Sequence, residues 1–202
     1  MSFLTEAFDD TISIDGKEYE VNMAFDNILL LFEMFEDDSI TEQEKWLIAL
    51  QMLIPRFKEI IFDSFEDMIT LYKFILQKFL GFNGNQEDKE KVCDFKKDAE
   101  LIYASFFSAY KMDLIEQRGK LHWKKFNALL THLDDDTAFK KVVGYRTMEI
   151  PKPNKHNQEQ IKQIRKLKER YSLDDRTADE KVSDAFTSVG HALKGVAKKA
   201  GE

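Results

Sequence analysis

One stretch of this chain, residues 94–126, combines many aromatic side chains with the spacing of a helix. Its characteristic residues are Asp94, Phe95, Tyr103, Phe106, Tyr110, Asp113, Leu114, Leu121, His122, Trp123 and Phe126. Apolar side chains three and four positions apart share one helix face, so they predict burial among packed helices. Docking of a partner is the alternative interpretation. Stacking of nucleotide bases is a further one, but such platforms lie in basic grooves, and the neighbours here are acidic.

The composition also favours helices. The 202 residues include only 8 Gly and 3 Pro, which argues against a turn-rich β fold, and 17 Phe supply much of an apolar core. We expect a mainly α fold: a helical bundle-like domain with a short N-terminal β-hairpin and a flexible C-terminal tail. The expected parts are a helical body at residues 1–150, a charged helix at 151–172 and a flexible, partner-binding tail at 173–202.

The hairpin is predicted at residues 11–21, where two alternating runs flank Asp15-Gly16. Both positions of so tight a turn need a positive φ, which Asp and Gly tolerate. Thr41 and Glu44 fit a capping box, while Pro55 and Gly81 are expected to end helices. The expected helices cover residues 24–35, Thr41 to Pro55, Ser64 to Gly81, 94–110, 121–133, 139–145 and 158–171.

The aromatic run resembles a bacteriophage family, the tail assembly chaperones encoded near the tape-measure gene of long-tailed phages of Gram-positive hosts. The shared features are Asp-Phe at 94–95, Ile-Tyr-Ala-Ser-Phe at 102–106, Tyr-x-x-Asp-Leu at 110–114 and Leu-His-Trp-x-x-Phe at 121–126. Lys111 and Met112 depart from the Gly and Ile that the family often has there. The chain after Tyr171 has no counterpart in the family pattern.

The resemblance implies a protein that binds the tape-measure protein, keeps its coiled-coil-prone segments in solution and helps to recruit tail-tube subunits. It also implies a place in the host cytoplasm and absence from, or low abundance in, the finished virion. The sequence agrees with that place, because no uncharged apolar run reaches the roughly 18 residues of a membrane span. The start of the chain also lacks the basic and apolar segments of a signal peptide.

The charge is unevenly distributed. Residues 1–150 carry 29 acidic and 18 basic side chains, a net charge of −11, whereas residues 151–172 carry 2 acidic and 7 basic ones. Because nucleic-acid affinity rests mainly on neutralising phosphates, the acidic body disfavours it as a partner. The alternative function is a nucleic-acid-binding or regulatory phage protein that acts through residues 152–170. A solvated helix that packs Ile161, Ile164 and Leu167 on the body is the simpler interpretation of that segment.

The C-terminal tail contains an apolar seam with the spacing of a coiled coil. Its predicted partner-binding residues are Val182, Phe186, Val189, Leu193 and Val196. Gly190 and Gly195 interrupt the seam, and each glycine costs a helix interior about 1 kcal/mol. We therefore expect the tail to become helical on a partner, with self-association and simple disorder as alternatives.

No catalytic or metal-binding set is visible in the sequence. The run Asp134–Asp136 lacks the spacing of a calcium loop, and capping of the next helix explains it better. No Ser or Cys nucleophile lies at a recognisable spacing from His122, so we expect a packed histidine rather than a general base. Cys93 is the one cysteine, which excludes an internal disulfide. We expect no enzymatic activity, no cofactor and no metal.

Overall fold

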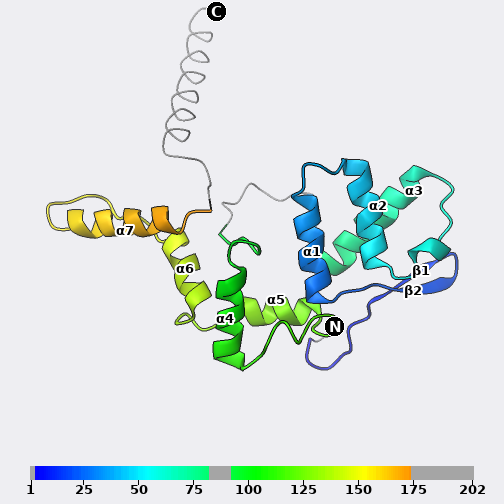
Figure 1. The fold of residues 1–202 in the computed structure, drawn as a ribbon, viewed down its shortest axis with the longest axis horizontal. Coiled ribbons are helices and arrows are strands. Elements are labelled where there is room, and N and C mark those ends of the chain that lie inside the picture. The colour runs from blue at the N-terminus through cyan, green and yellow to red at the C-terminus, as the bar shows by residue number, and fades with distance from the viewer. Residues whose placement is uncertain (1–2, 82–91, 174–202) are drawn as a thin grey trace, which may run out of the picture. The chain divides into compact units, whose positions relative to one another are not determined.

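The computed structural model describes residues 3–81 and 92–173, and the structural statements below concern these residues. The chain forms two compact units, Met1–Gly144 and a second unit that begins at Tyr145. Helices dominate the described residues, and a two-stranded sheet lies near the N-terminus (Figure 1). The predicted mainly α fold with an N-terminal hairpin is confirmed.

The hairpin pairs β1 (Thr11–Ile14) with β2 (Lys17–Glu20) in antiparallel register, with Ile12 opposite Tyr19. The turn residues Asp15 and Gly16 have φ angles of 50° and 75°. This is the pair of left-handed conformations that a two-residue hairpin turn requires. Ile12 and Tyr19 are both buried, so one face of the hairpin closes over the helices of the first unit.

The first core of this unit lies between the hairpin, α1 (Phe25–Phe35), α2 (Glu42–Leu53) and α3 (Phe65–Ile75). Within it, α2 packs against both α1 and α3 (Figure 1). The fully buried side chains Ile28, Leu31, Ala49, Leu50, Leu53, Ile54 and Ile75 form its centre. After α2 comes a short 3₁₀ helix, η1 (Phe57–Glu59), and α3 continues into the π-helical turn η2 (Leu76–Leu80). As predicted, Gly81 ends that turn with a positive φ of 73°.

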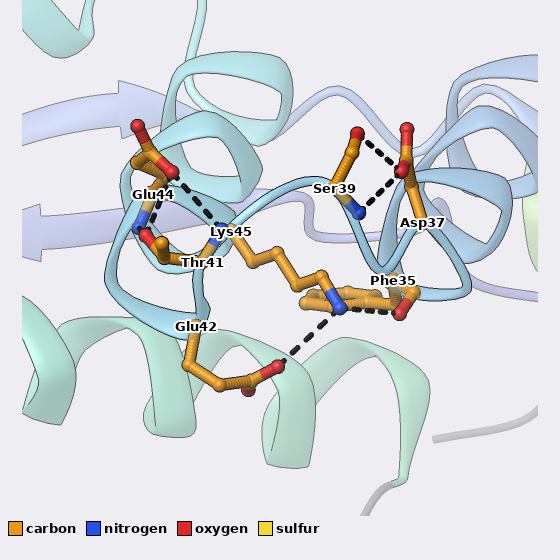
Figure 2. A network of polar contacts seen from close by, with 7 residues as sticks. All are labelled: Phe35, Asp37, Ser39, Thr41, Glu42, Glu44 and Lys45. Atoms are coloured by element: carbon orange, nitrogen blue, oxygen red, sulfur yellow. Dashed lines mark hydrogen bonds and ion pairs between the residues drawn. The ribbon is translucent and has the colours of Figure 1, made fainter.

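The corner between α1 and α2 is held by the predicted capping box (Figure 2). Thr41 Oγ1 accepts a hydrogen bond from the amide of Glu44 at 3.4 Å, and the amide of Thr41 donates to Glu44 Oε2 at 3.0 Å. The buried ammonium of Lys45 donates to the carbonyl of Phe35 at 2.8 Å and pairs with Glu42 Oε1 at 3.3 Å. A carbonyl at the end of α1, which has no partner within its own helix, is thereby satisfied from α2.

The second core of the first unit lies around α4 (Ala99–Tyr110) and α5 (Trp123–Thr131). Here α4 packs against α5, and α5 packs against α1. The predicted start of the first of these helices, Asp94, was wrong by five residues. Asp94 Oδ1 accepts hydrogen bonds from the amides of Lys96 and Lys97, both at 2.9 Å, and residues 95–98 form a turn before the helix begins.

The chain between α4 and α5 forms turns over residues 114–120. Asp113 Oδ1 accepts a hydrogen bond from the amide of Ile115 at 2.8 Å. The bond closes a turn that does not continue into a helix. Gly119, with a positive φ of 69°, interrupts this segment, and its amide donates to Asp26 Oδ1 of α1 at 2.9 Å.

The helix α6 (Ala138–Thr147) leads into the second unit, which contains α7 (Gln158–Arg170). Within this unit the rings of Tyr145 and Tyr171 stack with centroids 5.4 Å apart. Lys168 donates to the carbonyls of Arg146 and Met148, near the end of α6. The charged helix predicted at residues 158–171 is therefore present. Ile161 and Ile164 form its buried side.

Candidate functional site

An aromatic cluster in the first unit unites most of the rings of the motif. Phe126 on α5 stacks on Phe25 at 4.9 Å and on Phe106 at 5.2 Å between ring centroids. Phe95 and Trp123 contact the same ring at 6.4 and 5.6 Å. The rings of Phe106 and Phe126 are completely enclosed. The motif therefore contributes the centre of the second core, as its helical spacing indicates.

Trp123 has a different position from Phe126. It is half-buried and packs against both cores, and its ring lies edge-on to Phe32 at 5.6 Å. The side chain lies at the boundary between the two cores of the first unit, where part of its indole remains accessible.

The aromatic residues of α4 divide into two stripes. Ile102 and Phe106 are buried, whereas Tyr103 is half-buried and the exposed fraction of Phe107 is 51%. Each residue along a helix turns by about 100°, so neighbouring positions fall on different faces. Tyr103 packs against the second core with only part of its ring accessible, whereas Phe107 is half-exposed. One part of the motif is core, and the other part is surface.

A hollow of about 410 Å³ opens beside this exposed stripe. We call it the motif hollow. It is lined by Phe25, Leu29, Phe95, Ala99, Glu100, Ile102, Tyr103, Leu114, Ile115, Arg118 and Phe126. These residues come from α1, α4, α5, the residues before α4 and the turns after it. The helical spacing of the motif does not by itself predict this hollow, because segments far apart in the sequence must converge to form it.

The polar side chains that line the motif hollow are Glu100, Arg118 and Tyr103, and two further carboxylates, Asp113 and Glu116, lie near the Tyr103 hydroxyl. The hydroxyl of Tyr103 donates to Asp113 Oδ2 at 3.2 Å. Burial raises the pKa of Tyr103, and the negative charges of Asp113 and Glu116 raise it further. Glu100 and Arg118 complete the charged rim. The arrangement offers apolar surface with an acidic border, and it has no nucleophile paired with a base.

His122 serves as the N-cap of α5. Its Nδ1 accepts a hydrogen bond from the amide of Lys124 at 3.0 Å, so the proton of the neutral ring is assigned to Nε2, which lies 3.1 Å from Asp10 Oδ1. The imidazole also stacks on Phe8 with centroids 4.2 Å apart. These contacts join the N-terminal segment to α5. They are those of a packed, half-buried histidine.

The remaining motif residues hold the backbone around the cluster. The amide of Asp94 donates to Asp98 Oδ2 at 3.0 Å, and both carboxylates are buried. The hydroxyl of Tyr110 donates to the carbonyl of Leu129 at 2.9 Å. Leu114 and Leu121 are buried in the second core. The buried Asp98 is a structural residue, and it lies four positions after Asp94, across the turn that precedes α4.

Residues 3–81 and 92–173 were searched for groups of metal-binding side chains and for helices that could span a membrane. No group of three His, Cys, Asp or Glu side chains in these ranges is placed to hold a metal ion. No helix there combines the length and the apolarity needed to cross a membrane. The predicted partner-binding residues of the tail, Val182, Phe186, Val189, Leu193 and Val196, lie outside the described residues.

A second hollow lies in the second unit, along α7. Its lining is largely basic, with Lys162, Arg165 and Lys166 beside Glu169 and the buried Ile161. The cations follow helical spacing and point to solvent as exposed side chains. For this segment the sequence allowed two interpretations: a surface that binds a partner, or a helix whose charged side is simply solvated.

Among known protein families, one matches most of the chain. The family described as Bacteriophage Gp15 protein matches residues 4–173. No curated protein and no solved structure gives a significant match. The family match includes the aromatic cluster, the motif hollow and α7, and residues 174–202 lie beyond it.

Proposed function

Because this chain belongs to the Bacteriophage Gp15 protein family, we propose that it is a phage tail assembly chaperone that binds the tape-measure protein. The observation that carries the proposal is the motif hollow, where the exposed Ile115 and the partly buried Phe95 and Tyr103 present apolar surface on a helical scaffold. Open apolar surface bordered by polar groups is typical of protein-binding sites. The likeness of residues 94–126 to the tail assembly chaperones supports the same function.

The client in this proposal is a segment of the tape-measure protein that is helical and apolar on one side. A groove between helices receives such a segment through side chains spaced three and four residues apart. Binding would cover the client's apolar side until it enters the growing tail. The protein in this role is no enzyme and needs no cofactor. It acts in the host cytoplasm and is absent from, or minor in, the virion.

Further partners belong to the same proposal. Recruitment of the tail-tube protein would bring the tube subunits to a client that is already bound. The seam at Val182, Phe186, Val189, Leu193 and Val196 would add a second contact with the client, or join two copies of the chain. Both arrangements raise the effective concentration of one binding site near another.

Co-expression with the tape-measure protein tests the function directly. We expect the tape-measure protein to remain in the supernatant and to co-purify with the chain, and to precipitate when it is expressed alone. The control is an unrelated acidic helical protein at the same expression level. A tape-measure protein that stays in solution without this chain, or never co-purifies with it, would contradict the proposal.

The basic side of α7 favours a second candidate, a nucleic-acid-binding or regulatory protein. Lys162, Arg165 and Lys166 could contact phosphates, although the body at residues 1–150 is acidic. We expect DNA and RNA binding no tighter than about 10⁻⁴ M at physiological salt, the ordinary non-specific level. A mobility shift at low protein concentration would favour the second candidate, provided that charge reversal at these three positions and high salt both abolish it.

A further inference from the structure

We propose that the motif hollow and the exposed stripe of α4 beside it dock an amphipathic helix that carries apolar side chains one turn apart and a lysine or arginine beside them. The inference rests on the proposed function, because it specifies which surface receives the client and which chemistry that surface selects. It is separate from the seam in the tail, which lies outside the described residues.

The stripe runs along two turns of α4. Ala99, Tyr103 and Phe107 follow one another at intervals of four, which places them in a row about 12 Å long. The rings of Tyr103 and Phe107 stack with centroids 6.4 Å apart, so the outer ring is held in line with the inner one. Phe107 is half-exposed, and the row ends at a side chain that contacts solvent.

The motif hollow continues this row inward. Tyr103 belongs to both, and Ile115 faces the hollow from the turns after α4 with an exposed fraction of 57%. A hollow of about 410 Å³ lies within the range of roughly 300–1,000 Å³ found for binding pockets. It has room for more than one apolar side chain. A row and a hollow in continuity match a helix that inserts side chains at neighbouring turns.

Charge decides between possible helices. Glu100 lines the hollow, and Asp113 and Glu116 lie close enough to Tyr103 to act on its hydroxyl, whereas Arg118 is the cation in the lining. The body of residues 1–150 carries a net charge of −11. Such a surface attracts a basic partner and repels an acidic one, which affects both the rate of encounter and the choice of partner. The occupant is therefore a helix with basic flanks.

The test uses two synthetic peptides of about 18 residues, ~27 Å long when helical. Both carry leucines at the same positions of one face. One has lysines beside that face, and the other has glutamates. Their binding to the full chain is followed by fluorescence anisotropy, after circular dichroism has shown that the two peptides are equally helical. We expect the lysine peptide to bind at least about tenfold more tightly than the glutamate peptide.

Matched variants locate the site. Phe107→Ala and Ile115→Ala each remove an exposed apolar side chain. We expect each substitution to weaken binding of the lysine peptide by about tenfold. Phe74→Ala is the control, because Phe74 is also a helical phenylalanine that is half-exposed, on α3 instead of α4. We expect it to bind as the parent does. Equal binding by all four proteins would overturn the assignment of the site, and equal binding of the two peptides would overturn the charge selection.

Other occupants give different results. A parent that forms dimers which Phe107→Ala dissociates would identify a second copy as the occupant. A peptide of residues 174–202 that binds in a Phe107-dependent way, while the lysine peptide does not, would identify the chain's own tail. Co-purification with the tape-measure protein separates this site from the proposed function. If the double variant Phe107→Ala, Ile115→Ala still captures the tape-measure protein, the function stands and this site is wrong. If the parent fails to capture it but binds the lysine peptide through Phe107, the site stands and the function is wrong.

Discussion

Phe126 and Phe107 show how differently two aromatic side chains of one motif are used. Phe126 lies against Phe25 and Phe106 inside the second core, and its exposed fraction is 1%. Phe107 is half-exposed beside the motif hollow. Burial of an aromatic side chain contributes to stability, whereas a half-exposed ring is available to a partner.

Substitution separates these roles. We expect Phe126→Ala to lower the free energy of unfolding by about 3–5 kcal/mol, because it removes a completely buried ring and leaves a cavity. Phe107→Ala should change it by no more than about 0.5 kcal/mol, as usual for surface positions. Trp123→Ala should fall between them, since its ring is half-buried. Urea denaturation of the three variants measures the differences, and a loss for Phe107→Ala as large as that for Phe126→Ala would place Phe107 in the core.

Tyr72 on α3 predicts how stability depends on alkaline pH. Burial raises the pKa of Tyr72 to about 12, and the negative charge of Glu42 adds to this effect. In the unfolded chain a tyrosine ionises near pH ~10, so the unfolded state loses this proton first. The stabilisation is complete below that pH and is lost as the pH rises towards the folded-state pKa. We expect the free energy of unfolding to fall over this range.

Tyr72→Phe is the matched variant for that prediction, because phenylalanine has no proton to lose. Denaturation from about pH 9 to about pH 12 should show a steeper loss of stability for the parent than for the variant. Phenolate absorbance in the same range should show a tyrosine in the parent that titrates late. Parallel pH profiles for the two proteins would mean that Tyr72 ionises as freely in the folded state as in the unfolded one.

Helix starts and turns were the most predictable elements, because their signals are local. The capping box of Thr41 and Glu44, the turn at Asp15-Gly16 and the stop at Gly81 each depend on residues within four positions of one another. The start of α4 was missed because the carboxylate of Asp94 binds amides of the next turn instead of beginning the helix. Asp supports both arrangements, so the sequence alone does not choose.

The capping box gives a prediction for α2. We expect Thr41→Ala to lower the free energy of unfolding by about 1 kcal/mol, since the amide of Glu44 loses its acceptor. The hydrogen bonds from Thr41 also lower the pKa of Glu44, so part of this difference should disappear as the pH falls through that pKa. Thr70→Ala is the control, because Thr70 lies inside α3 and its hydroxyl binds the carbonyl of Glu66. Urea denaturation should show little change for Thr70→Ala, and equal losses would rule out a special role for the cap.

At the scale of the full chain, the family match and the two described cores end before residue 174. We therefore expect deletion of residues 174–202 to leave the melting temperature of the body nearly unchanged. The same deletion, or Phe186→Asp with Leu193→Asp, should weaken capture of the tape-measure protein, because an unpaired charge in an apolar contact is costly. Thermal melts and co-purification are measured on the same proteins. A melting temperature lowered by many degrees, with capture intact, would make the tail part of the fold.

The sequence by itself determined the helical class, the hairpin and its turn, and the residues that cap or end several helices. These features depend on φ preferences, side-chain hydrogen bonds to nearby amides and apolar spacing along one element. The sequence also singled out the aromatic residues, but it did not divide them between core and surface. Tyr103 and Phe106 are only three positions apart, and both fit a helical apolar pattern.

Only the tertiary structure decided which of these side chains are enclosed. Phe106 is covered because Phe126 of α5 stacks on it, while no described element covers Phe107 to the same extent. The motif hollow likewise needs α1, α4 and α5 to converge, and the buried Ser105 of α4 accepts a hydrogen bond from the amide of Phe139 at 3.0 Å, across 34 positions of sequence. Such contacts depend on how elements far apart in the chain pack together, and no local pattern encodes that packing.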